Sequence, residues 1–420
     1  MADSGKIRTF PKDPYGGQKA ENTNKARTGG LRARLLRALR RQPADGSQFR
    51  DYSLLFIILF LLGFGLVMLY STSSYSAIVD YGDSAFYFRK QLIFTLMGLG
   101  LMVFVSFIPY RWYRVLSVPA YLAAAGLIFL IIPFGNEGGG AKRWLEIFGM
   151  NLQPAEVAKV AVIMLTATII EREGRKELAS TAGLLKPLIP SAIMAVMIWQ
   201  ITDNLSSAII VLAITMGMLF VACPDYKRFV VMAGAVGVSA FLLVSYIVNA
   251  ADRSTMEFRG RRILAWLDPI AYEDISYQTV QALYAIGSGG FLGKGLGQSM
   301  QKMIVPEAQN DMIFSIICEE LGLFGAIGIM FMFILLIWRF MAIANNAEDM
   351  YGAMLVVGVI SHIAVQVVLN ISVVTNTMPN TGVTLPFFSY GGSSIFFLMA
   401  EIGIVLSVSR GIRFRKTEDG

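Results

Sequence analysis

Long apolar stretches alternate with short polar segments along most of the chain. Beyond residue 52 these stretches reach or approach the ~20 residues that a helix needs to cross a bilayer. Each is predicted to be a membrane-spanning helix, because a backbone inside hydrocarbon must satisfy its own hydrogen bonds. The pattern predicts ten spans, at approximately 53–73, 90–109, 115–133, 154–171, 186–202, 205–222, 228–249, 311–338, 350–375 and 391–410.

Composition agrees with this pattern. Of the 420 residues 55% are hydrophobic and 15% are charged, whereas a soluble domain carries roughly 25% charged residues. The predicted fold class is an all-α polytopic membrane protein with about ten transmembrane helices and one large extracytoplasmic loop, about 250–310, between helices 7 and 8. The net charge of +7 does not indicate nucleic acid, since membrane proteins gather positive charge in cytoplasmic loops and at anionic headgroups.

The charge distribution divides the chain into three parts. Residues 1–50 are polar and basic and are predicted to be a disordered cytoplasmic tail. Residues 51–412 form the transmembrane domain, and residues 413–420 form a second cytoplasmic tail. Lys and Arg near the span ends fall on one side, predicted to be the cytoplasm. An even number of spans places both termini there.

Three carboxylates occur in the segment "VPEAQNDMIFSIICEELGLFG" at 305–325. Ionised acids in hydrocarbon are costly, so such residues face the bundle interior or a wet cavity and are candidates for function. Asp311 stands at the outer boundary, where partial burial raises a carboxyl pKa and suits it to accept a proton. Glu319 and Glu320 lie deeper. Glu320 is predicted to form a buried structural pair, with Lys159 of span four as a candidate partner.

Two further clusters fall on the same predicted outer side. The segment "GGGAKRWLEIFGMNLQPAEVAK" at 138–159 places cations in a loop and opens span four with a polar turn; Glu156 and Lys159 have the i,i+3 spacing that allows contact. The segment "TNTMPNTGVTLPFFSYGGSS" at 375–394 is polar and kinked by prolines, and its Ser393 could cap a helix or hold a ligand. The cluster residues that could contact a phosphate or sugar are Lys142, Arg143, Gln153 and Ser393, together with Arg259 and Lys302 of the large loop.

Other familiar chemistries are disfavoured. The glycine-rich segment at 285–299 fails the phosphate-loop pattern at both ends and indicates close backbone packing instead. The single histidine, His362, falls inside an apolar span and is interpreted as a hydrogen-bonded packing residue. Cys223 and Cys318 lie far apart and are interpreted as buried thiols without a disulfide.

The quoted segments, together with "YQTVQALYAIGSGGFLGKGLGQSMQK" at 277–302, closely resemble the SEDS family of peptidoglycan glycosyltransferases, which includes FtsW, RodA and SpoVE. The similarity covers about 53–410. Asn-Thr-Gly at 380–382 and "LPFFSYGGSS" favour the FtsW branch. The family aspartate matches Asp311, but Gln309 and Asn310 replace a His-Thr pair that usually precedes it.

The resemblance implies polymerisation of lipid II into glycan strands on the outer face of the bacterial inner membrane, with Asp311 as general base. It also implies a glycan donor linked to undecaprenyl pyrophosphate and, for the FtsW branch, divisome proteins as partners. A class B penicillin-binding protein would crosslink the strands. A divalent cation, Mg²⁺ or Mn²⁺, near Asp311 is left open, as are division, elongation or sporulation roles.

Two other function classes remain open from the residues alone. A lipid II flippase would use wet intramembrane Glu and Lys equally well, although the sequence shows no convincing internal repeat of the kind common in transporters. A scaffold that only recruits a transpeptidase has no need of an acid at the membrane edge. An elongation polymerase of the RodA type is the alternative within the family.

Overall fold

All ten predicted spans are helices. The computed structural model describes residues 52–138, 141–147, 150–249 and 258–412, so the predicted tails at 1–50 and 413–420 lie outside the described residues. The spans correspond to α2 (Tyr52–Tyr81), α3 (Phe86–Phe107), α4 (Arg111–Phe134), α5 (Pro154–Leu178), α6 (Thr181–Thr202), α7 (Leu205–Ala222), α8 (Lys227–Asn249), α11 (Ile313–Asn345), α12 (Met350–Val374) and α13 (Gly392–Arg410).

Within the described residues, nine of these ten helices are long and apolar enough to cross a membrane, and α5 is the exception. Its first turns carry Glu156 and Lys159, and Glu171 follows. Glu156 and Lys159 are buried, so α5 is a charged helix inside the bundle. The apolar residues that surround α5 shield those charges from lipid.

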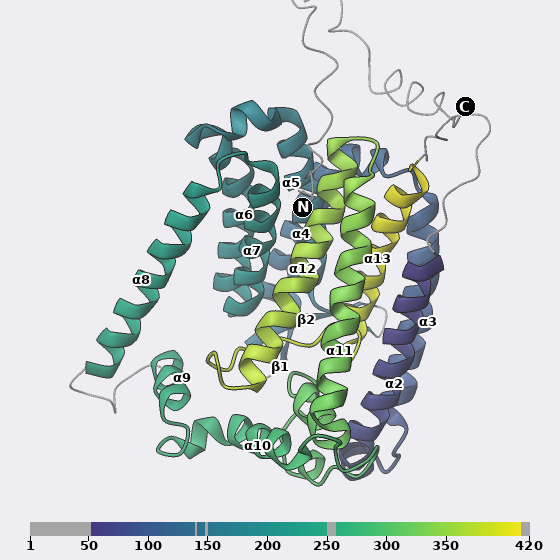
Figure 1. The fold of residues 1–420 in the computed structure, drawn as a ribbon, viewed down its shortest axis with the longest axis vertical. Helices are drawn as coiled ribbons and strands as arrows, with labels where there is room; N and C mark the ends of the chain where they lie inside the picture. Colours follow the sequence, from purple (N-terminus) through teal and green to yellow (C-terminus); the bar gives the residue numbers. More distant parts are fainter. Residues whose placement is uncertain (1–51, 139–140, 148–149, 250–257, 413–420) are drawn as a thin grey trace, which may run out of the picture. The chain divides into compact units, whose positions relative to one another are not determined.

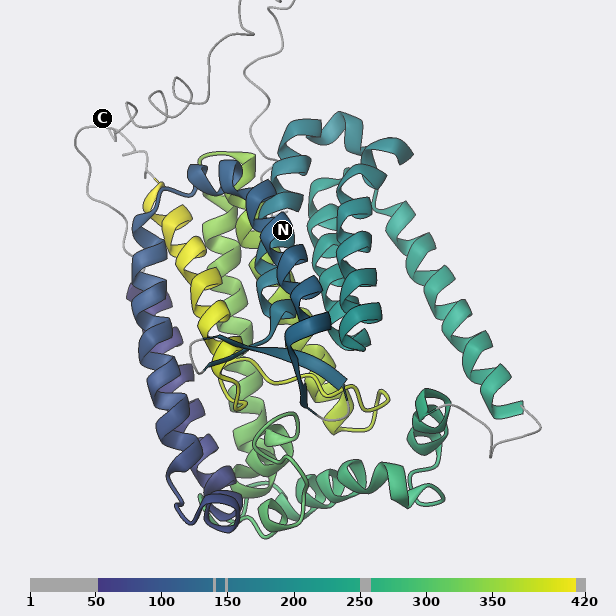
Figure 2. The same ribbon diagram turned by 180° about the vertical axis from the view of Figure 1, so that it is seen from behind.

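The main bundle has one large hydrophobic core and a smaller one. The large core joins residues of α2, α5, α7, α11, α12 and α13, and the smaller core joins α4, α5, α6 and α7. Helix α8 stands apart from the bundle in both ribbon views (Figures 1 and 2). Most of its side chains are exposed, with Phe229 as its buried residue. In a bilayer those apolar side chains would face lipid.

The structure corrects the all-α expectation in one place. Residues between α4 and α5 form a three-stranded antiparallel sheet of β1 (Gly135–Gly138), β2 (Ala141–Ile147) and β3 (Met150–Leu152). Leu145 pairs with Gly135 on one side and with Leu152 on the other. These strands are only three to seven residues long, and runs this short carry too little periodicity to predict a sheet.

The segment predicted as one large loop contains helices of its own. They are α9 (Phe258–Leu267), α10 (Glu273–Gly289) and the short 3₁₀ helix η1 (Gln301–Met303). Helix α10 packs against α11. Trp266 of α9 donates its indole N–H to the Asn376 carbonyl at 3.0 Å. The Asn376 amide donates back to the Trp266 carbonyl at 3.3 Å. These contacts join α9 to the segment after α12.

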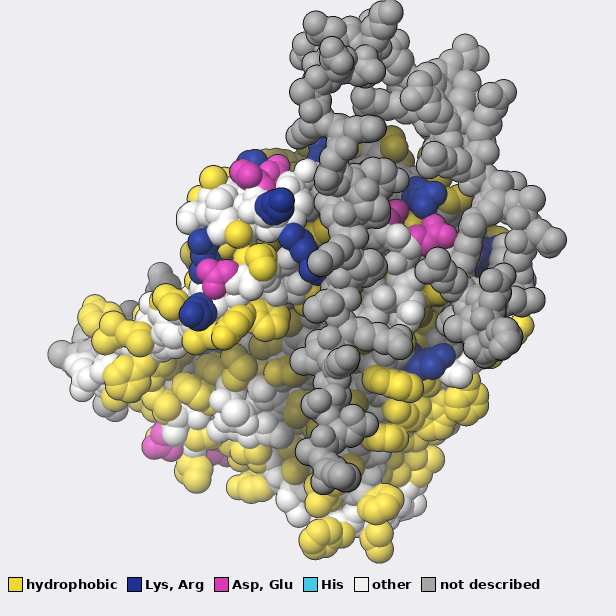
Figure 3. Space-filling model, turned by 45° about the horizontal axis from the view of Figure 1, so that its top comes forward, with side chains coloured by type: hydrophobic (Ala, Val, Ile, Leu, Met, Phe, Trp, Pro, Cys, Tyr) yellow, Lys and Arg dark blue, Asp and Glu magenta, His cyan; other side chains and the backbone are white. Residues whose placement is uncertain are grey.

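Charged side chains gather where α4, α6, α8 and α12 begin, here called the basic end. Arg111 pairs with Glu348 at 2.9 Å, and Arg114 pairs with Glu171. Figure 3 shows basic and acidic side chains over this end and apolar side chains over the flank below it. The sheet, α9, α10 and the polar segment 375–391 lie at the opposite end, here called the site end (Figures 1 and 2).

A break in α11 depends on one glycine. Gly322 has φ +66°, and a Cβ there would lie 2.4 Å from the Gly293 nitrogen. We therefore expect Gly322→Ala to lower stability by about 2–4 kcal/mol, seen as an apparent Tm about 5 °C lower in detergent. Gly328→Ala on the same helix is the matched control, because its Cβ would meet no atom within 4 Å. Equal Tm values for the two variants would show that the break is not required.

Candidate active site

Asp311 lies in the turn just before α11, at the site end of the bundle. Its side chain is 8% exposed. One carboxylate oxygen, Oδ1, accepts a hydrogen bond from the Gln278 amide at 3.1 Å. Its backbone carbonyl accepts from the Asn370 amide at 2.7 Å, and the same amide donates to the Val383 carbonyl at 2.7 Å. The acid is therefore held by side chains of α10 and α12.

The amide of Gln278 links Asp311 to the polar segment before α13. Gln278 also donates to the Pro306 carbonyl at 3.0 Å, and its own oxygen accepts from the Asn380 amide at 2.9 Å. Asn380 in turn accepts from the Gly382 nitrogen at 3.2 Å. A Cβ on Gly382 would lie 3.9 Å from Asp311 Oδ2. The second carboxylate oxygen thus lies beside a glycine that leaves space next to it.

Burial raises the pKa of the Asp311 carboxyl from its ordinary 3.8 to about 6. Desolvation is the main cause, and the negative charge of Glu307 adds to it. The backbone hydrogen bond at Asp311, the Gln278 amide and the Arg262 charge act in the opposite direction. A carboxyl with this pKa is ionised at neutral pH yet basic enough to take a proton, as a general base requires.

The glycine-rich segment after α10 is fastened to α11 by Glu319. This carboxylate is fully buried and accepts from Lys294 Nζ at 2.6 Å and from the Ser299 hydroxyl. The backbone nitrogens of Met300 and Gln301 also point to it, at 3.3 and 3.2 Å. Ser288 completes the set at 3.3 Å. Five donors from one segment satisfy a charge that hydrocarbon would not tolerate.

Glu320 is buried and structural, but the predicted partner is wrong. Ser71 of α2 donates to its two oxygens at 2.6 and 2.8 Å, and Lys302 Nζ lies 4.0 Å away. Lys159 instead pairs with Glu156 at 2.8 Å, as their i,i+3 spacing predicted. The correction has a simple cause: Lys159 has an acid one turn away on its own helix.

The prediction of close packing at 285–299 is confirmed. Beyond Gly289, the backbone runs beside the broken part of α11, and the Lys294 and Gly295 nitrogens donate to the Glu319 and Glu320 carbonyls at 2.9 Å. A Cβ at Gly289 or Gly293 would lie 2.0 or 2.2 Å from a carbonyl of α11. Glycine is required there because two backbones touch.

The predicted substrate-binding cations have different surroundings. Lys142 is exposed on β2. Arg143 donates to the Thr202 and Asp203 carbonyls at 3.2 and 2.9 Å, which caps the C-terminus of α6. Lys302 is buried and donates to the Gly297 carbonyl at 2.7 Å. Arg259 falls within α9, and its side chain lies outside the described residues.

The remaining predicted residues lie around the start of α5 and α13. Gln153 is the residue before α5, without a side-chain cap bond. Ser394 donates to Glu156 at 3.4 Å, so the Glu156–Lys159 pair meets the first turn of α13. Ser393 is buried with no hydrogen-bond partner for its hydroxyl among the described residues. The segment 380–394 links the two regions: Asn380 bonds to Gln278, which holds Asp311, and Ser394 bonds to Glu156.

Sequence reasoning missed the residues that hold the acid. Gln278 lies within a segment quoted for the resemblance, yet nothing in its spacing pointed to Asp311. Asn370 is one of several polar residues in a predicted membrane span, which is a usable signal for a packing or site role. Arg262 lies among several cations of the large loop, and its charge alone did not single it out. The structure alone brings α9, α10 and α12 to the same turn.

Two interior predictions are also confirmed. His362 Nδ1 lies 2.7 Å from Glu401 of α13, so it is a hydrogen-bonded residue between two helices. Cys223 and Cys318 are both free and buried.

The turn at Asp203 and Asn204, where α6 ends and α7 begins, is tight. The Asn204 side chain accepts a hydrogen bond from the Ser207 nitrogen at 3.0 Å.

A bundle of apolar helices with a buried acid at one end defines a polytopic membrane protein with a polar site at the bilayer surface. The model of the FtsW, RodA and SpoVE family, described as "Cell cycle protein", matches residues 52–413. The chain belongs to this family. It is a multi-pass protein of the bacterial inner membrane.

The relatives are similar over almost their whole length. Stage V sporulation protein E of Bacillus subtilis (strain 168) is 36% identical, over 87% of this chain and 98% of its own. A probable peptidoglycan glycosyltransferase FtsW of Trichlorobacter lovleyi is 37% identical, over 86% and 94%. These values exclude a match limited to one motif.

Solved structures share the fold. A chain from a study of how a peptidoglycan synthase complex coordinates polymerization and crosslinking has a TM-score of 0.70 and 26% identity, covering 86% of this chain and 97% of that one. The rod shape determining protein RodA of Thermus thermophilus has a TM-score of 0.60 and 24% identity, covering 87% and 98%.

We expect Glu319→Gln to loosen the segment 288–301. The change removes the charge that pairs with Lys294 and weakens the remaining hydrogen bonds, at a cost of about 2–3 kcal/mol. Amide hydrogen exchange measured by mass spectrometry should rise about tenfold or more in that segment. Glu273→Gln, at an exposed acid of α10, is the control. Unchanged exchange in Glu319→Gln would mean that the carboxylate does not fasten the segment.

Proposed function

We propose that this chain is a peptidoglycan glycosyltransferase that polymerises lipid II into glycan strands, with Asp311 as general base. The observation that carries the proposal is a buried carboxylate with a pKa of about 6. It is held by the amide of Gln278 at the site end of a family member. The similar proteins named as peptidoglycan glycosyltransferases support the reaction class.

The concentration of Lys and Arg at the basic end supports a site that faces away from the cytoplasm. Arg111, Arg114, Lys186 and Arg228 lie at the basic end in ion pairs. Positive charge near span ends marks the cytoplasmic side, so the site end faces the outside and both termini are cytoplasmic. An outer site can reach lipid II only after the precursor has crossed the membrane. The division role implied by the FtsW branch belongs to this proposal.

The proposed step is a single displacement. The 4-hydroxyl of the GlcNAc of lipid II attacks the anomeric carbon at the reducing end of the growing strand. Asp311 takes the hydroxyl proton as the new C–O bond forms. The old bond from that carbon to the pyrophosphate breaks, and undecaprenyl pyrophosphate leaves with the bonding electrons. The step uses one carboxylate, as general base, and forms no covalent glycosyl-enzyme.

The leaving pyrophosphate needs positive charge near it. Arg262 acts on Asp311 electrostatically and is therefore a nearby cation, and Lys142 is exposed at the same end. Arg143 and Lys302 already donate to backbone carbonyls, so they are weaker candidates. No cluster of three acid, histidine or cysteine side chains occurs among the described residues. A divalent ion near Asp311, if bound with the substrate phosphate, would offset leaving-group charge.

The proposed partners are a class B penicillin-binding protein, which crosslinks the strands, and divisome proteins. The similar chain from a synthase complex that coordinates polymerization with crosslinking supports the first. A detergent-purified complex that forms polymer from lipid II would separate the glycosyltransferase from a flippase, because transport alone forms no polymer.

Asp311→Asn should lose at least about 100-fold in polymerisation rate while keeping the Tm of the parent protein, since the amide keeps the shape but cannot accept the proton. The rate is measured by gel analysis of glycan strands formed from lipid II by the purified complex. Asp80→Asn, at an exposed acid of α2, is the control. Normal strand synthesis by Asp311→Asn would end the general-base role.

The rate should also depend on pH. Because the base must be ionised, kcat/KM should fall as pH drops through about 6 with the slope of one proton. The Gln278 hydrogen bond lowers the Asp311 pKa, so Gln278→Leu should move the midpoint upward by about half a unit to one unit. Gln298→Leu, at an exposed residue, should leave it in place. A midpoint that Gln278→Leu does not move would contradict the assignment.

A further inference from the structure

A cluster of aromatic rings lies at the site end, where the turn between α2 and α3 meets the segment before α13. Its members are Tyr81, Phe86, Tyr87 and Tyr390, here called the aromatic platform. Figures 1 and 2 show this turn beside the loops that follow α10, and α2 packs against η1. No step of the proposed displacement uses these rings, although they lie next to the site.

Tyr81 presents an open ring face. Its other face stacks on Phe86, with ring centroids 3.7 Å apart and ring planes 14° apart. Tyr87 meets both rings edge-on, and Lys90 Nζ lies 4.4 Å from the centroid of the Phe86 ring. Tyr81 nevertheless stays 54% exposed. A flat apolar surface, fixed from behind by a second ring, is therefore available to a ligand.

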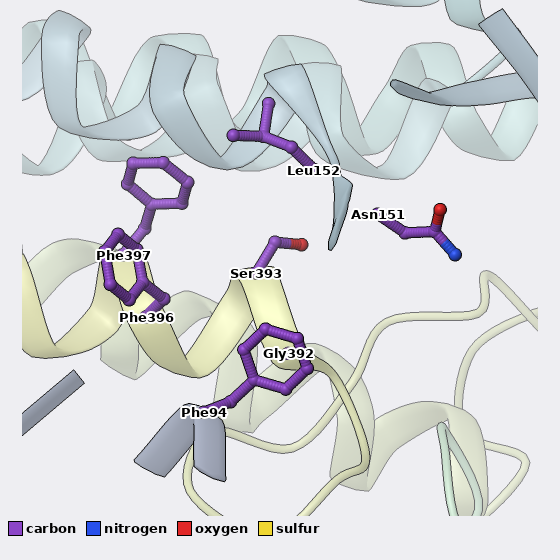
Figure 4. A pocket seen from close by; sticks show the side chains of 7 residues that line it. All are labelled: Phe94, Asn151, Leu152, Gly392, Ser393, Phe396 and Phe397. Carbon is purple, nitrogen blue, oxygen red and sulfur yellow. The ribbon is translucent and has the colours of Figure 1, made fainter. Parts of the chain in front are cut away.

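Tyr390, at the other end of the platform, is fixed against α3. Gln91 of α3 accepts a hydrogen bond from the Gly391 nitrogen at 3.2 Å. A Cβ at Gly392 would lie 2.5 Å from the Phe94 ring of α3, and Figure 4 shows that ring beside Gly392. The backbone next to Tyr390 therefore touches α3 closely, and the platform is held in place before any ligand binds.

The platform is continuous with the Asp311 site. The Tyr87 and Tyr390 rings meet edge to face, with centroids 4.9 Å apart. The Tyr390 nitrogen donates to the Gln309 carbonyl at 2.8 Å, two residues before Asp311. Glu307 lies near both, because its charge acts on Tyr87 and on Asp311. A chain of sugars that reacts at Asp311 can therefore extend onto these rings.

The surroundings of Tyr81 suit a saccharide. The face of an aromatic ring carries partial negative charge, which attracts the C–H groups on the apolar face of a pyranose. Ligand sites lined by aromatic rings add a few polar groups that fix orientation. Asp83, two residues beyond Tyr81, pairs with Arg89, whose side chain is 64% exposed. This pair supplies a donor and an acceptor for sugar hydroxyls close to the open face.

We propose that the open face of Tyr81 stacks on a pyranose ring of the growing glycan strand, at a subsite beyond the bond that forms. The inference rests on the proposed function, because the strand is the donor and the product of that reaction. Two sugars meet at the acid in each addition, whereas a strand that stays bound between additions needs contacts farther along. The platform retains the strand and takes no part in the displacement.

An interfacial anchor is the competing role for an exposed tyrosine, because Tyr and Trp gather where a bilayer meets water. Tyr75 lies on the same helix and is 41% exposed, so it is the matched control. An anchor at Tyr81 would contribute to the position of α2 in the bilayer and would bind no sugar. Saccharide binding therefore separates the two roles.

Binding of a soluble saccharide tests the platform without requiring activity. The full chain in phosphatidylglycerol nanodiscs is titrated with chitotetraose, four linked GlcNAc units, and saturation-transfer NMR reports the contact. We expect binding by the parent protein and about fivefold weaker affinity in Tyr81→Ala, whereas Tyr81→Phe keeps the ring and the affinity. Tyr75→Ala should bind as the parent does. Equal affinity in Tyr81→Ala and the parent, or no binding by the parent, would overturn the proposal.

Strand length gives a second test. With lipid II and the purified complex, Tyr81→Ala should form strands about fivefold shorter on gels, and strand length should fall more than the rate of lipid II consumption. Tyr75→Ala should form strands of parent length. If the parent complex forms polymer and Tyr81→Ala strands match it in length, the platform assignment fails while the proposed function stands. If the parent complex forms none, the proposed function fails, and saccharide binding still decides the platform.

Discussion

The burial of two adjacent glutamates is the constraint on which the site end depends. Glu319 and Glu320 are both fully buried inside an apolar helix, where an unpaired charge would be too costly to keep. Hydrogen-bond donors from outside the helix stabilise both carboxylates. The glycine-rich segment donates to Glu319, and Ser71 donates to Glu320. The same bonds therefore fix the segment that leads from α10 to Asp311.

The geometry of the acid follows from this anchoring. With the segment after α10 fastened to α11, Gln278 of α10 can donate both to Asp311 and to the Pro306 carbonyl. Burial then raises the pKa of Asp311 while the amide and Arg262 keep it from rising further. The balance yields a base that is ionised at neutral pH. In this chain the position of the proposed general base is thus a consequence of structural carboxylates deeper in the bundle.

Much of the site could be predicted, and the limits are physical. The cost of an acid beside hydrocarbon singled out Asp311, and helical spacing correctly paired Glu156 with Lys159. Spacing could not show that Glu320 contacts Ser71, 249 residues earlier in the chain. Nor could charge alone show that Arg143 caps α6. Residues of these kinds bind a phosphate or a carbonyl equally well, and only their neighbours decide which.

The sequence by itself determined the ten helices and the acid at the membrane edge, because hydrophobic length and the cost of buried charge act locally along the chain. The tertiary structure decided which polar residues meet: Gln278, Asn370 and Asn380 come from three elements and converge near one turn. It also decided that the segment before α5 forms a sheet. Strands form by pairing with one another, and that pairing leaves little trace in strands of three to seven residues.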